Sequence, residues 1–587
     1  MPDPQLVLAA RVQAALSAAF GPSYADADPV IRPSQFADLQ SNVALPLAKR
    51  LQAERGEKQN PRAVAEEILD RLDVADLVSA VEVSGPGFLN FTFSDDWIAA
   101  RAQDVLGDER LGVPRKERPE KVIVEYSSPN VAKEMHVGHL RTTIVGDAIA
   151  RILEFAGDEV VRDNHVGDWG TPFGMLIEQL LDVGVEKAAT DDSSVSDLTA
   201  FYQAARQKFD SDEEFADRSR QRVVKLQAGD AETMRLWQIL VDVSKRYFNL
   251  VYRKLGVTLT DDDIKGESFY NDLLAPTARE LTDKGIAEVS EGALVVFPPG
   301  FKGREGDPLP VIVRKSDGGY NYSTTDLATI RYRSDTEHAD RVVYVVGAPQ
   351  SLHFQMAFAV ARMAGWVNDG MKLEHAEIGN VLGTDGKILR TRAGGTVKLS
   401  ELLEEAVERA GVEFDKIERD EPLEAAVRAD IVEKVGIGAV KYADLSVARD
   451  SEYIFDFDRM IAFKGNTGPY LQYATARIKS IFHRAGTAPE QATGPIRIGH
   501  PAERALALRL LDFGAALKQA GDAAEPHKLA AYIYSVADAY TTFYENCPVL
   551  KAPDEETKAS RLALCAATLR TLETGLDLLG VPVPERM

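Results

Sequence analysis

Two histidines three residues apart, His136 and His139, flank Gly138 in the string EYSSPNVAKEMHVGHLRTT, residues 125–143. If a helix begins beside them, both imidazoles face one ligand and can donate hydrogen bonds to phosphate oxygens as charge builds in a transition state. Gly138 lets that ligand approach the main chain, and Lys133 adds a positive charge. The alternative interpretation is two histidines satisfied within a loop.

The neighbouring segments predict how this string is held. VIVEY (122–126) is apolar enough for a buried parallel strand. Apolar residues at helical spacing then mark one face of a helix that begins around His139 and ends near Gly157, namely Leu140, Ile144, Ala148 and Ile152. Strand, turn and helix in this order place backbone N–H groups at the carboxyl edge of a parallel sheet, where anionic ligands bind.

Composition bounds the class of protein. The chain has 587 residues, 45% hydrophobic and 27% charged, which indicates three or four folded domains rather than disorder. It has no apolar run long enough to cross a membrane and no basic flank of a secretory signal, so we expect no membrane partner. Its two cysteines and lack of zinc-like spacing favour a reducing, cytoplasmic compartment and no zinc. Taken alone, the net charge of −23 argues against nucleic acid.

The pattern along the chain predicts three domains. Residues 1–112 combine helical and strand-like pieces, 113–435 alternate strands and loops around a helical stretch, and 436–587 are helical. Residues 401–430 are acidic and indicate a solvated helix pair, whereas 459–484 hold five basic residues and no acid. We therefore expect an acidic body with a basic track, formed by Lys133, Arg141, residues 387–398 and residues 459–484.

The string HVGH resembles the HIGH signature of class I aminoacyl-tRNA synthetases, and its longer context resembles arginyl-tRNA synthetases. Further segments resemble the same family in the same order: FADLQSNVALPLAKRL, GTDGKILRTRAGGTVKL (383–399), GNTGPYLQYATARI (465–478) and VPVPERM. The resemblance covers the whole chain. It implies an α/β fold: a Rossmann-like parallel-sheet catalytic domain with helical insertions, a small α+β N-terminal domain that contacts the tRNA elbow, and an all-α C-terminal anticodon-binding domain.

The activity that the resemblance implies is ATP-dependent activation of L-arginine and its transfer to the 3'-terminal adenosine of tRNA(Arg), used in protein synthesis. ATP would bring Mg²⁺, held mainly by phosphate oxygens and water. The ATP-binding residues implied are Lys133, His136, Gly138, His139 and His353. The resemblance also implies a monomer in which activation requires bound tRNA.

A second class I signature, KMSKS, is incomplete in this chain. The corresponding loop, 383–395, holds Lys387 and Arg390 but lacks the last lysine. The resemblance implies that Lys133 compensates, so the catalytic candidates are Lys133, His136, His139, Lys387 and Arg390. Which cation contributes most is left open, and a flexible basic loop is the alternative for Lys387 and Arg390.

Selection of arginine requires acids aimed at a planar guanidinium. Asp326 follows Tyr322 by four residues, so a helix there would place both on one face. The arginine-binding residues implied are Glu125, Ser128, Asn130, His139, Tyr322, Asp326 and Gln350. A helix-start acid is the alternative for Asp326, and a core tyrosine for Tyr322.

For tRNA, the resemblance points to both ends of the chain, and the candidates are Phe88, Asn90, Tyr470, Tyr473, Arg477 and Met587. Packing within the fold is the alternative for the aromatic residues. The alternative functions are a small nucleotidyltransferase, a class I synthetase for another amino acid, and a non-catalytic relative. Both histidines, the paired acids and all three regions argue against them.

Overall fold

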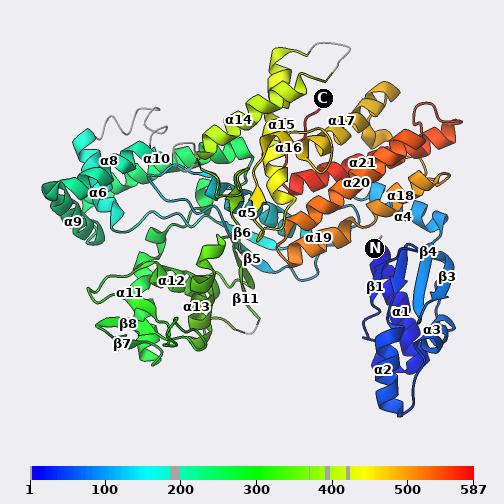
Figure 1. Ribbon diagram of the computed structural model, residues 1–587, viewed down its shortest axis with the longest axis horizontal. Coiled ribbons are helices and arrows are strands. Elements are labelled where there is room, and N and C mark those ends of the chain that lie inside the picture. Colours follow the sequence, from blue (N-terminus) through cyan, green and yellow to red (C-terminus); the bar gives the residue numbers. More distant parts are fainter. Residues whose placement is uncertain (1–2, 185–197, 369, 391–396, 418–422) are drawn as a thin grey trace.

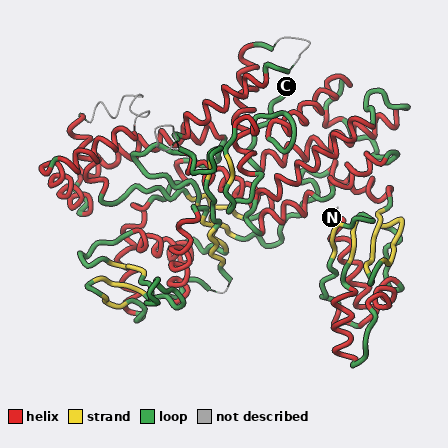
Figure 2. Tube along the Cα trace, in the orientation of Figure 1, coloured by secondary structure: helices red, strands yellow, loops and turns green. Residues whose placement is uncertain are grey.

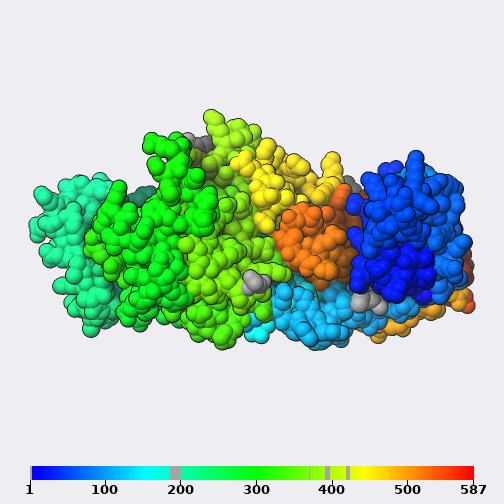
Figure 3. Space-filling view, turned by 90° about the horizontal axis from the view of Figure 1, so that it is seen from below, coloured from blue at the N-terminus to red at the C-terminus, as the bar shows by residue number. Residues whose placement is uncertain are grey.

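The computed structural model describes residues 3–184, 198–368, 370–390, 397–417 and 423–587. The molecule is elongated (Figure 1). Its strands gather in small sheets, and helices form most of the rest (Figure 2). Seen from below, helical insertions occupy one end, the N-terminal lobe in blue occupies the other, and C-terminal helices in orange lie beside it (Figure 3). Every described helix is too short or too polar to span a bilayer.

The N-terminal lobe is an α+β unit, as expected. Its antiparallel sheet has the order β1-β2-β4-β3. The strands are β1 (Ile31–Pro33), β2 (Leu39–Ser41), β3 (Val78–Ser84) and β4 (Phe88–Phe93). The helices are α1 (Pro4–Phe20), α2 (Ala44–Arg55), α3 (Pro61–Leu69) and α4 (Asp95–Gly107). Residues 108–120, which follow α4, form neither helix nor strand and connect this lobe to the central sheet.

The central sheet is parallel, with the order β11-β10-β5-β6. Its strands are β5 (Lys121–Glu125), β6 (Glu159–Asp163), β10 (Arg341–Tyr344) and β11 (Lys372–His375). Their last residues are in register, so Glu125 lies between Asp163 and Tyr344 at one edge. Side chains alternate across the strands: Val122 and Val124 pack in the core that contains α5 (Val137–Ala156). Ile123 packs in the core that contains α12 (Tyr322–Asp335) and α13 (Ser351–Met363).

Helices and a second sheet are inserted between β6 and β10. The helices are α6 (Pro172–Val183), α8 (Leu198–Ser211), α9 (Glu213–Gln227), α10 (Ala231–Leu255), α11 (Asn271–Asp283) and α12 (Tyr322–Asp335); α13 (Ser351–Met363) follows β10. The expected alternation of strands and loops includes ALVVF and LPVIVR, whose strands join a separate antiparallel sheet of β7 (Glu288–Ser290), β8 (Ala293–Val296) and β9 (Val311–Arg314).

Among the described residues after β11, the regular structure is helical except for one short parallel pair, β12 (Val381–Leu382) with β13 (Tyr453–Ile454). The helices are α14 (Leu399–Phe414), α15 (Ala425–Leu445), α16 (Phe457–Met460), α17 (Gly468–Ala485), α18 (Pro501–Leu510), α19 (Phe513–Asp522), α20 (Pro526–Asn546) and α21 (Glu555–Leu578). The sequence predicts a solvated helix pair over 401–430. In the structure α14 and α15 each bury one face, on which Leu402, Ala406 and Val435 lie. The expected boundary at 435 falls inside α15.

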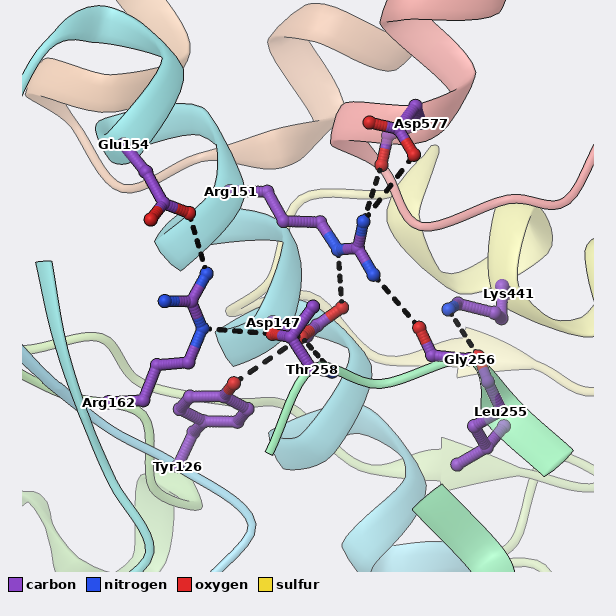
Figure 4. A network of polar contacts seen from close by, with 10 residues as sticks. All are labelled: Tyr126, Asp147, Arg151, Glu154, Arg162, Leu255, Gly256, Thr258, Lys441 and Asp577. Carbon is purple, nitrogen blue, oxygen red and sulfur yellow. Dashed lines mark hydrogen bonds and ion pairs between the residues drawn. The ribbon is translucent and has the colours of Figure 1, made fainter. Parts of the chain in front are cut away.

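A polar network ties the predicted nucleotide-binding helix to the C-terminal helices (Figure 4). Asp147 of α5 accepts hydrogen bonds from Arg151 Nε at 2.8 Å and from the Thr258 amide at 2.9 Å. Arg151 also lies 3.5 Å from Asp577 at the end of α21. Lys441 of α15 is fully buried, donates to the Leu255 carbonyl at 2.6 Å, and has its pKa lowered by burial to about 8. The network therefore links α5 to the loop after α10 and to α21, and it links α15 to the end of α10.

Candidate active site

The strand–turn–helix predicted around the histidines is present. After β5 the chain turns through left-handed conformations at Ser127 (φ 70°) and Ser128 (φ 48°), which non-glycine residues seldom adopt. The helix then begins two residues before the predicted start, with His136 as its N-cap. Close packing needs Gly146, because a Cβ there would lie 2.2 Å from Tyr126 Cβ. The helix ends at Gly157, as predicted.

The two histidines cap the helix reciprocally. His136 Nδ1 accepts from the Gly138 amide, and His139 Nδ1 accepts from the His136 amide, both at 3.1 Å. Burial and then the neighbouring His136 lower the pKa of His139 to about 3, and burial with the charge of Lys133 lowers the pKa of His136. Because each Nδ1 accepts, the neutral rings carry their protons on Nε2. Each ring therefore has one donor for an anionic ligand.

Lys133 lies beside this pair and against an aromatic ring that the sequence did not reveal. Its Nζ is 4.3 Å from the ring centroid of Tyr202 on α8. Cation–π contacts hold an ammonium over a ring face without neutralising it. The pKa of His136 is lowered mainly by burial and, to a smaller extent, by the charge of Lys133. The contact between Lys133 and Tyr202 could not be predicted from the sequence, because the two residues are far apart in the chain and helical periodicity does not show which ring meets a lysine.

The KMSKS-like loop is described up to Arg390, and its residues 391–395 lie outside the described residues. It leaves β12 through a tight turn in which the Gly383 amide donates to the Lys387 carbonyl at 2.7 Å. Lys387 and Arg390 are exposed and line one cavity of about 890 Å³ with residues of α14. Within the described part of the chain, neither histidine lines this cavity.

Backbone pairing nonetheless joins this loop to the histidine segment. The Val137 amide donates to the Val397 carbonyl at 3.1 Å, and the Leu399 amide donates to the Met135 carbonyl at 3.0 Å. The segment that follows the basic loop is therefore fixed to the start of α5.

The candidates for guanidinium binding gather at the sheet edge and the start of α12. Asp326 Oδ2 is 2.5 Å from His353 Nε2, and the rings of Tyr322 and His353 meet edge to face at 5.0 Å. Tyr322 is 62% exposed, so it is not a core tyrosine. The helix α12 includes both Tyr322 and Asp326, as the spacing predicted. Glu125 is buried and pairs with Arg333 at 2.6 Å.

Ser128, Asn130 and Gln350 follow the carboxyl ends of neighbouring strands. The Ser128 amide donates to Asn164 Oδ1 at 3.0 Å, and Asn130 forms a bridge to Gly167. Gln350 is exposed just before α13. These three residues thus lie around the same edge as Glu125, and their roles in binding stay predictions.

The tRNA candidates lie in two lobes. Asn90 is 4% exposed and uses its amide within the N-terminal sheet, accepting from Ser34 and donating to Ser84. Phe88 is half-buried, whereas Phe36, which the sequence did not single out, is 84% exposed in the same lobe. An exposed ring is a stacking platform for bases, and exposure is the signal that a sequence does not carry.

In the C-terminal lobe, Arg477 Cζ lies 4.7 Å from the Tyr473 ring and 5.0 Å from the Tyr544 ring. Tyr470 hydrogen-bonds Thr541 at 2.9 Å. Met587 packs against the apolar cluster formed by α14 and α15. Tyr470, Tyr473 and Arg477 all lie on α17. Their contact with RNA stays a prediction.

The predicted basic track is wrong at two places. Arg141 is 1% exposed and paired with Asp444, so no phosphate can reach it. Lys479 lies 2.9 Å from Glu573 and 3.0 Å from Glu585, so the stretch 459–484 lacks acids in sequence but not in space. Acids supplied by distant segments neutralise these bases, and a local count of charges cannot show this.

The parallel sheet, the histidine-capped helix at its carboxyl edge and the helical C-terminal lobe define a class I aminoacyl-tRNA synthetase. The family model "tRNA synthetases class I (R), catalytic domain" matches residues 101–457. "Arginyl tRNA synthetase N terminal domain" matches 6–93, and "DALR anticodon binding domain" matches 471–587. The chain belongs to the arginyl-tRNA synthetase family.

Individual relatives agree over the full length. The chain is 62% identical to an arginine–tRNA ligase of Thermobifida fusca over 587 residues, 100% of each chain. It is 51% identical to the arginine–tRNA ligase of Frankia casuarinae, covering 98% of each. The solved arginyl-tRNA synthetase of Plasmodium falciparum superposes with a TM-score of 0.82 at 29% identity, covering 99% of both chains. That of Thermus thermophilus gives 0.81 at 27% identity over the whole of both.

Proposed function

We propose that this chain is an enzyme that activates L-arginine with ATP and transfers the arginyl group to tRNA(Arg). One observation carries the proposal: two neutral imidazoles, each with a free Nε2 donor, cap a helix at the sheet edge where Glu125 ends its strand. Donors for phosphate and acids for a guanidinium thus stand at one edge.

In the first step, the arginine carboxylate attacks the α-phosphorus of ATP. A carboxylate oxygen–phosphorus bond forms, the bond to the bridging oxygen breaks, and pyrophosphate leaves. The carboxylate is already ionised near neutral pH, so positioning and electrostatic stabilisation supply the catalysis. His136 and His139 donate to phosphate oxygens, Lys133 adds positive charge, and Lys387 and Arg390 bring cations from the loop.

ATP arrives with Mg²⁺, which neutralises phosphate charge when bound. The ion would be held mainly by phosphate oxygens and water, with the protein contributing hydrogen bonds from His136, His139 and His353 to ATP.

Arginine is selected by Glu125 and Asp326, whose carboxylates suit the fork of a guanidinium, with the Tyr322 ring beside them. Ser128, Asn130 and Gln350 contact the amino-acid head group. Asp326 already touches His353 at 2.5 Å. The arginine and ATP subsites therefore share a contact.

In the second step, a hydroxyl of the terminal adenosine of tRNA attacks the arginyl carbonyl carbon, and AMP leaves. The α17 residues Tyr470, Tyr473 and Arg477 are our candidates for the anticodon stem-loop, and the exposed Phe36 adds to Phe88 in the N-terminal lobe. We further infer a cytoplasmic monomer. Two free, buried cysteines, Cys547 and Cys565, fit a reducing compartment.

One assay tests the function. The purified full chain is given ATP, Mg²⁺ and tRNA(Arg), and the twenty amino acids are tested one at a time for attachment to the tRNA. Attachment of arginine alone is expected. Attachment of another amino acid, or none, would overturn the proposal.

A further inference from the structure

Arg333 lies beneath the sheet edge and is shared by two carboxylates. Its Nη2 is 2.6 Å from Glu125 Oε2 and 2.9 Å from Asp163 Oδ2. Arg333 and Asp163 are fully buried, and Glu125 is 6% exposed. The sheet register explains the sharing, because Glu125 and Asp163 stand opposite each other at the ends of adjacent parallel strands. The Arg333 guanidinium also lies 5.0 Å from the Tyr344 ring.

The helix that carries Arg333 also carries the other half of the proposed arginine site. Tyr322 and Asp326 lie in the first turns of α12, and Arg333 follows Asp326 by seven residues. Seven residues are close to two helical turns, so Asp326 and Arg333 share a face. The ion pair with Glu125 therefore fixes α12 against β5, and with it the distance between the two acids that would grip a guanidinium.

The cluster of Arg333, Glu125 and Asp163 also carries a net charge. Two carboxylates and one guanidinium leave one net negative charge for a cationic ligand. Burial raises the pKa of the Glu125 carboxyl, and the charge of Arg333 is the largest effect that opposes this rise. Asp163 acts in the other direction and adds to the rise. A protonated Glu125 could not pair with a substrate guanidinium as an ion.

Other titratable groups face Glu125 from each element around it. Burial lowers the pKa of His165, but the carboxylates of Glu125, Asp163 and Asp326 more than offset this, so that its pKa is raised. The groups around Glu125 and His165 come from α12, β6 and its loop, β10 and the short helix Glu267–Tyr270: Arg333, Asp326, Asp163, His165, Tyr344, Glu267 and Tyr270. Burial raises the pKa of Glu267 to about 7, so the titrations of His165 and Glu267 must both be separated from that of Glu125.

We propose that Arg333 is a positioning residue for L-arginine binding: its guanidinium, anchored by Asp163, holds the Glu125 carboxylate in place and favours its charged form. The inference rests on the proposed function. Because Arg333 is fully buried, it acts through Glu125 and not on the substrate. Its effect falls on arginine affinity and its pH dependence, and leaves ATP affinity alone.

The test measures L-arginine binding to the full chain by calorimetry, with tRNA(Arg) present, from pH 5 to 9. Arg333→Gln is expected to weaken arginine binding about tenfold or more at pH 7, and to move the acid limb of binding up by about one pH unit or more. Asp163→Asn is expected to move the same limb down, because it removes a charge that favours protonation of Glu125. A role in folding alone does not produce opposite shifts.

Control variants distinguish a failure of the proposed function from a failure of the positioning role of Arg333. Arg331→Gln, on the same helix but paired with Glu280 at 2.8 Å, should leave the limb in place, and so should Glu267→Gln. His165→Gln should move the limb up, because the charge of His165 opposes the rise in the pKa of the Glu125 carboxyl. If the wild type does not bind L-arginine, the proposed function falls. If it binds and the limb stays in place in Arg333→Gln and Asp163→Asn, or disappears in His165→Gln, the positioning role of Arg333 is overturned. Should Arg333→Gln not fold, Arg333→Lys with Asp163→Asn decides by the same criterion.

Discussion

Arg141 Nε lies 2.9 Å from Asp444 Oδ1, and both side chains are at most 1% exposed. Arg141 belongs to α5, two residues after the HVGH string, whereas Asp444 belongs to α15. The same guanidinium donates to the carbonyls of Gly379 and Ser451, at 2.9 and 2.8 Å. These carbonyls precede β12 and β13, and β12 leads directly into the KMSKS-like loop. One buried ion pair therefore sets the spacing between the two signature segments.

Asp444→Asn should strongly destabilise the protein. It leaves the Arg141 charge buried without an ionic partner, which costs about 3–5 kcal/mol in comparable buried pairs. Asp210→Asn breaks the exposed pair with Arg206 and should cost at most about 1 kcal/mol. Urea unfolding of both variants measures the difference. Equal losses of unfolding free energy would show that the buried pair contributes no more to stability than the exposed pair does.

Lys133→Ala should lower ATP–pyrophosphate exchange at least as much as Lys387→Ala does. Lys133 lies beside the histidine pair, and its charge is felt by His136, whereas Lys387 lines a cavity that neither histidine shares within the described residues. Pyrophosphate exchange at saturating arginine and tRNA compares the two. An unchanged rate in Lys133→Ala would contradict the assignment of Lys133 as the compensating cation.

Tyr202 should act through Lys133. The ammonium lies 4.3 Å from its ring centroid, and this contact is worth about 0.5–2 kcal/mol. Tyr202→Leu should slow exchange roughly 3- to 30-fold, Tyr202→Phe should keep most of the rate, and Tyr202→Leu should have no further effect in Lys133→Ala. Full additivity in the double variant would show that the ring acts elsewhere.

Local pattern was enough to predict the elements at the active site. The alternation from VIVEY to a helix with Leu140, Ile144 and Ile152 on one face correctly predicted β5 and α5, since burial on one face leaves a periodic trace. The same trace did not assign β8 and β9 to a separate sheet, because strand pairing depends on topology and not on composition.

Long-range partners could not be predicted. Arg141 and Asp444 are 303 residues apart, and Arg333 and Asp163 are 170 apart. A basic residue near HVGH is compatible with phosphate binding and with a buried ion pair, and only the fold decides between them. For this reason the sequence misplaced Arg141 on a basic track and missed Arg333 altogether.

Asp326→Ala should raise the KM for arginine roughly 10- to 100-fold with little change in the KM for ATP. An ionic hydrogen bond to a guanidinium is worth about 1.5–3 kcal/mol. Steady-state aminoacylation with each substrate varied in turn gives both constants. Asp335→Ala, at the exposed end of the same helix, is the matched control and should leave both unchanged. An unaltered KM for arginine would remove Asp326 from the site.

His139 should make the protein acid-sensitive. Its folded-state pKa of about 3 lies below the ordinary 6.5, so the unfolded chain binds an extra proton between these values. The free energy of unfolding therefore falls as the pH drops below 6.5, by up to about 2 kcal/mol at pH 5. His139→Gln should show a smaller drop in urea midpoint from pH 7 to 5, whereas His338→Gln, at an exposed site, should match the wild type. Identical drops would contradict this.

Arg477→Ala should weaken tRNA binding at every salt concentration and make it less salt-dependent. Its guanidinium is stacked between Tyr473 and Tyr544, with Cζ at 4.7 and 5.0 Å from the two ring centroids. Loss of one phosphate contact lowers the slope of log affinity against log salt by about one. Lys479→Ala is the matched control on the same helix, because Lys479 is already paired with Glu573 and Glu585. Filter binding from 50 to 300 mM salt measures both slopes, and an unchanged slope in Arg477→Ala would place the RNA on another face.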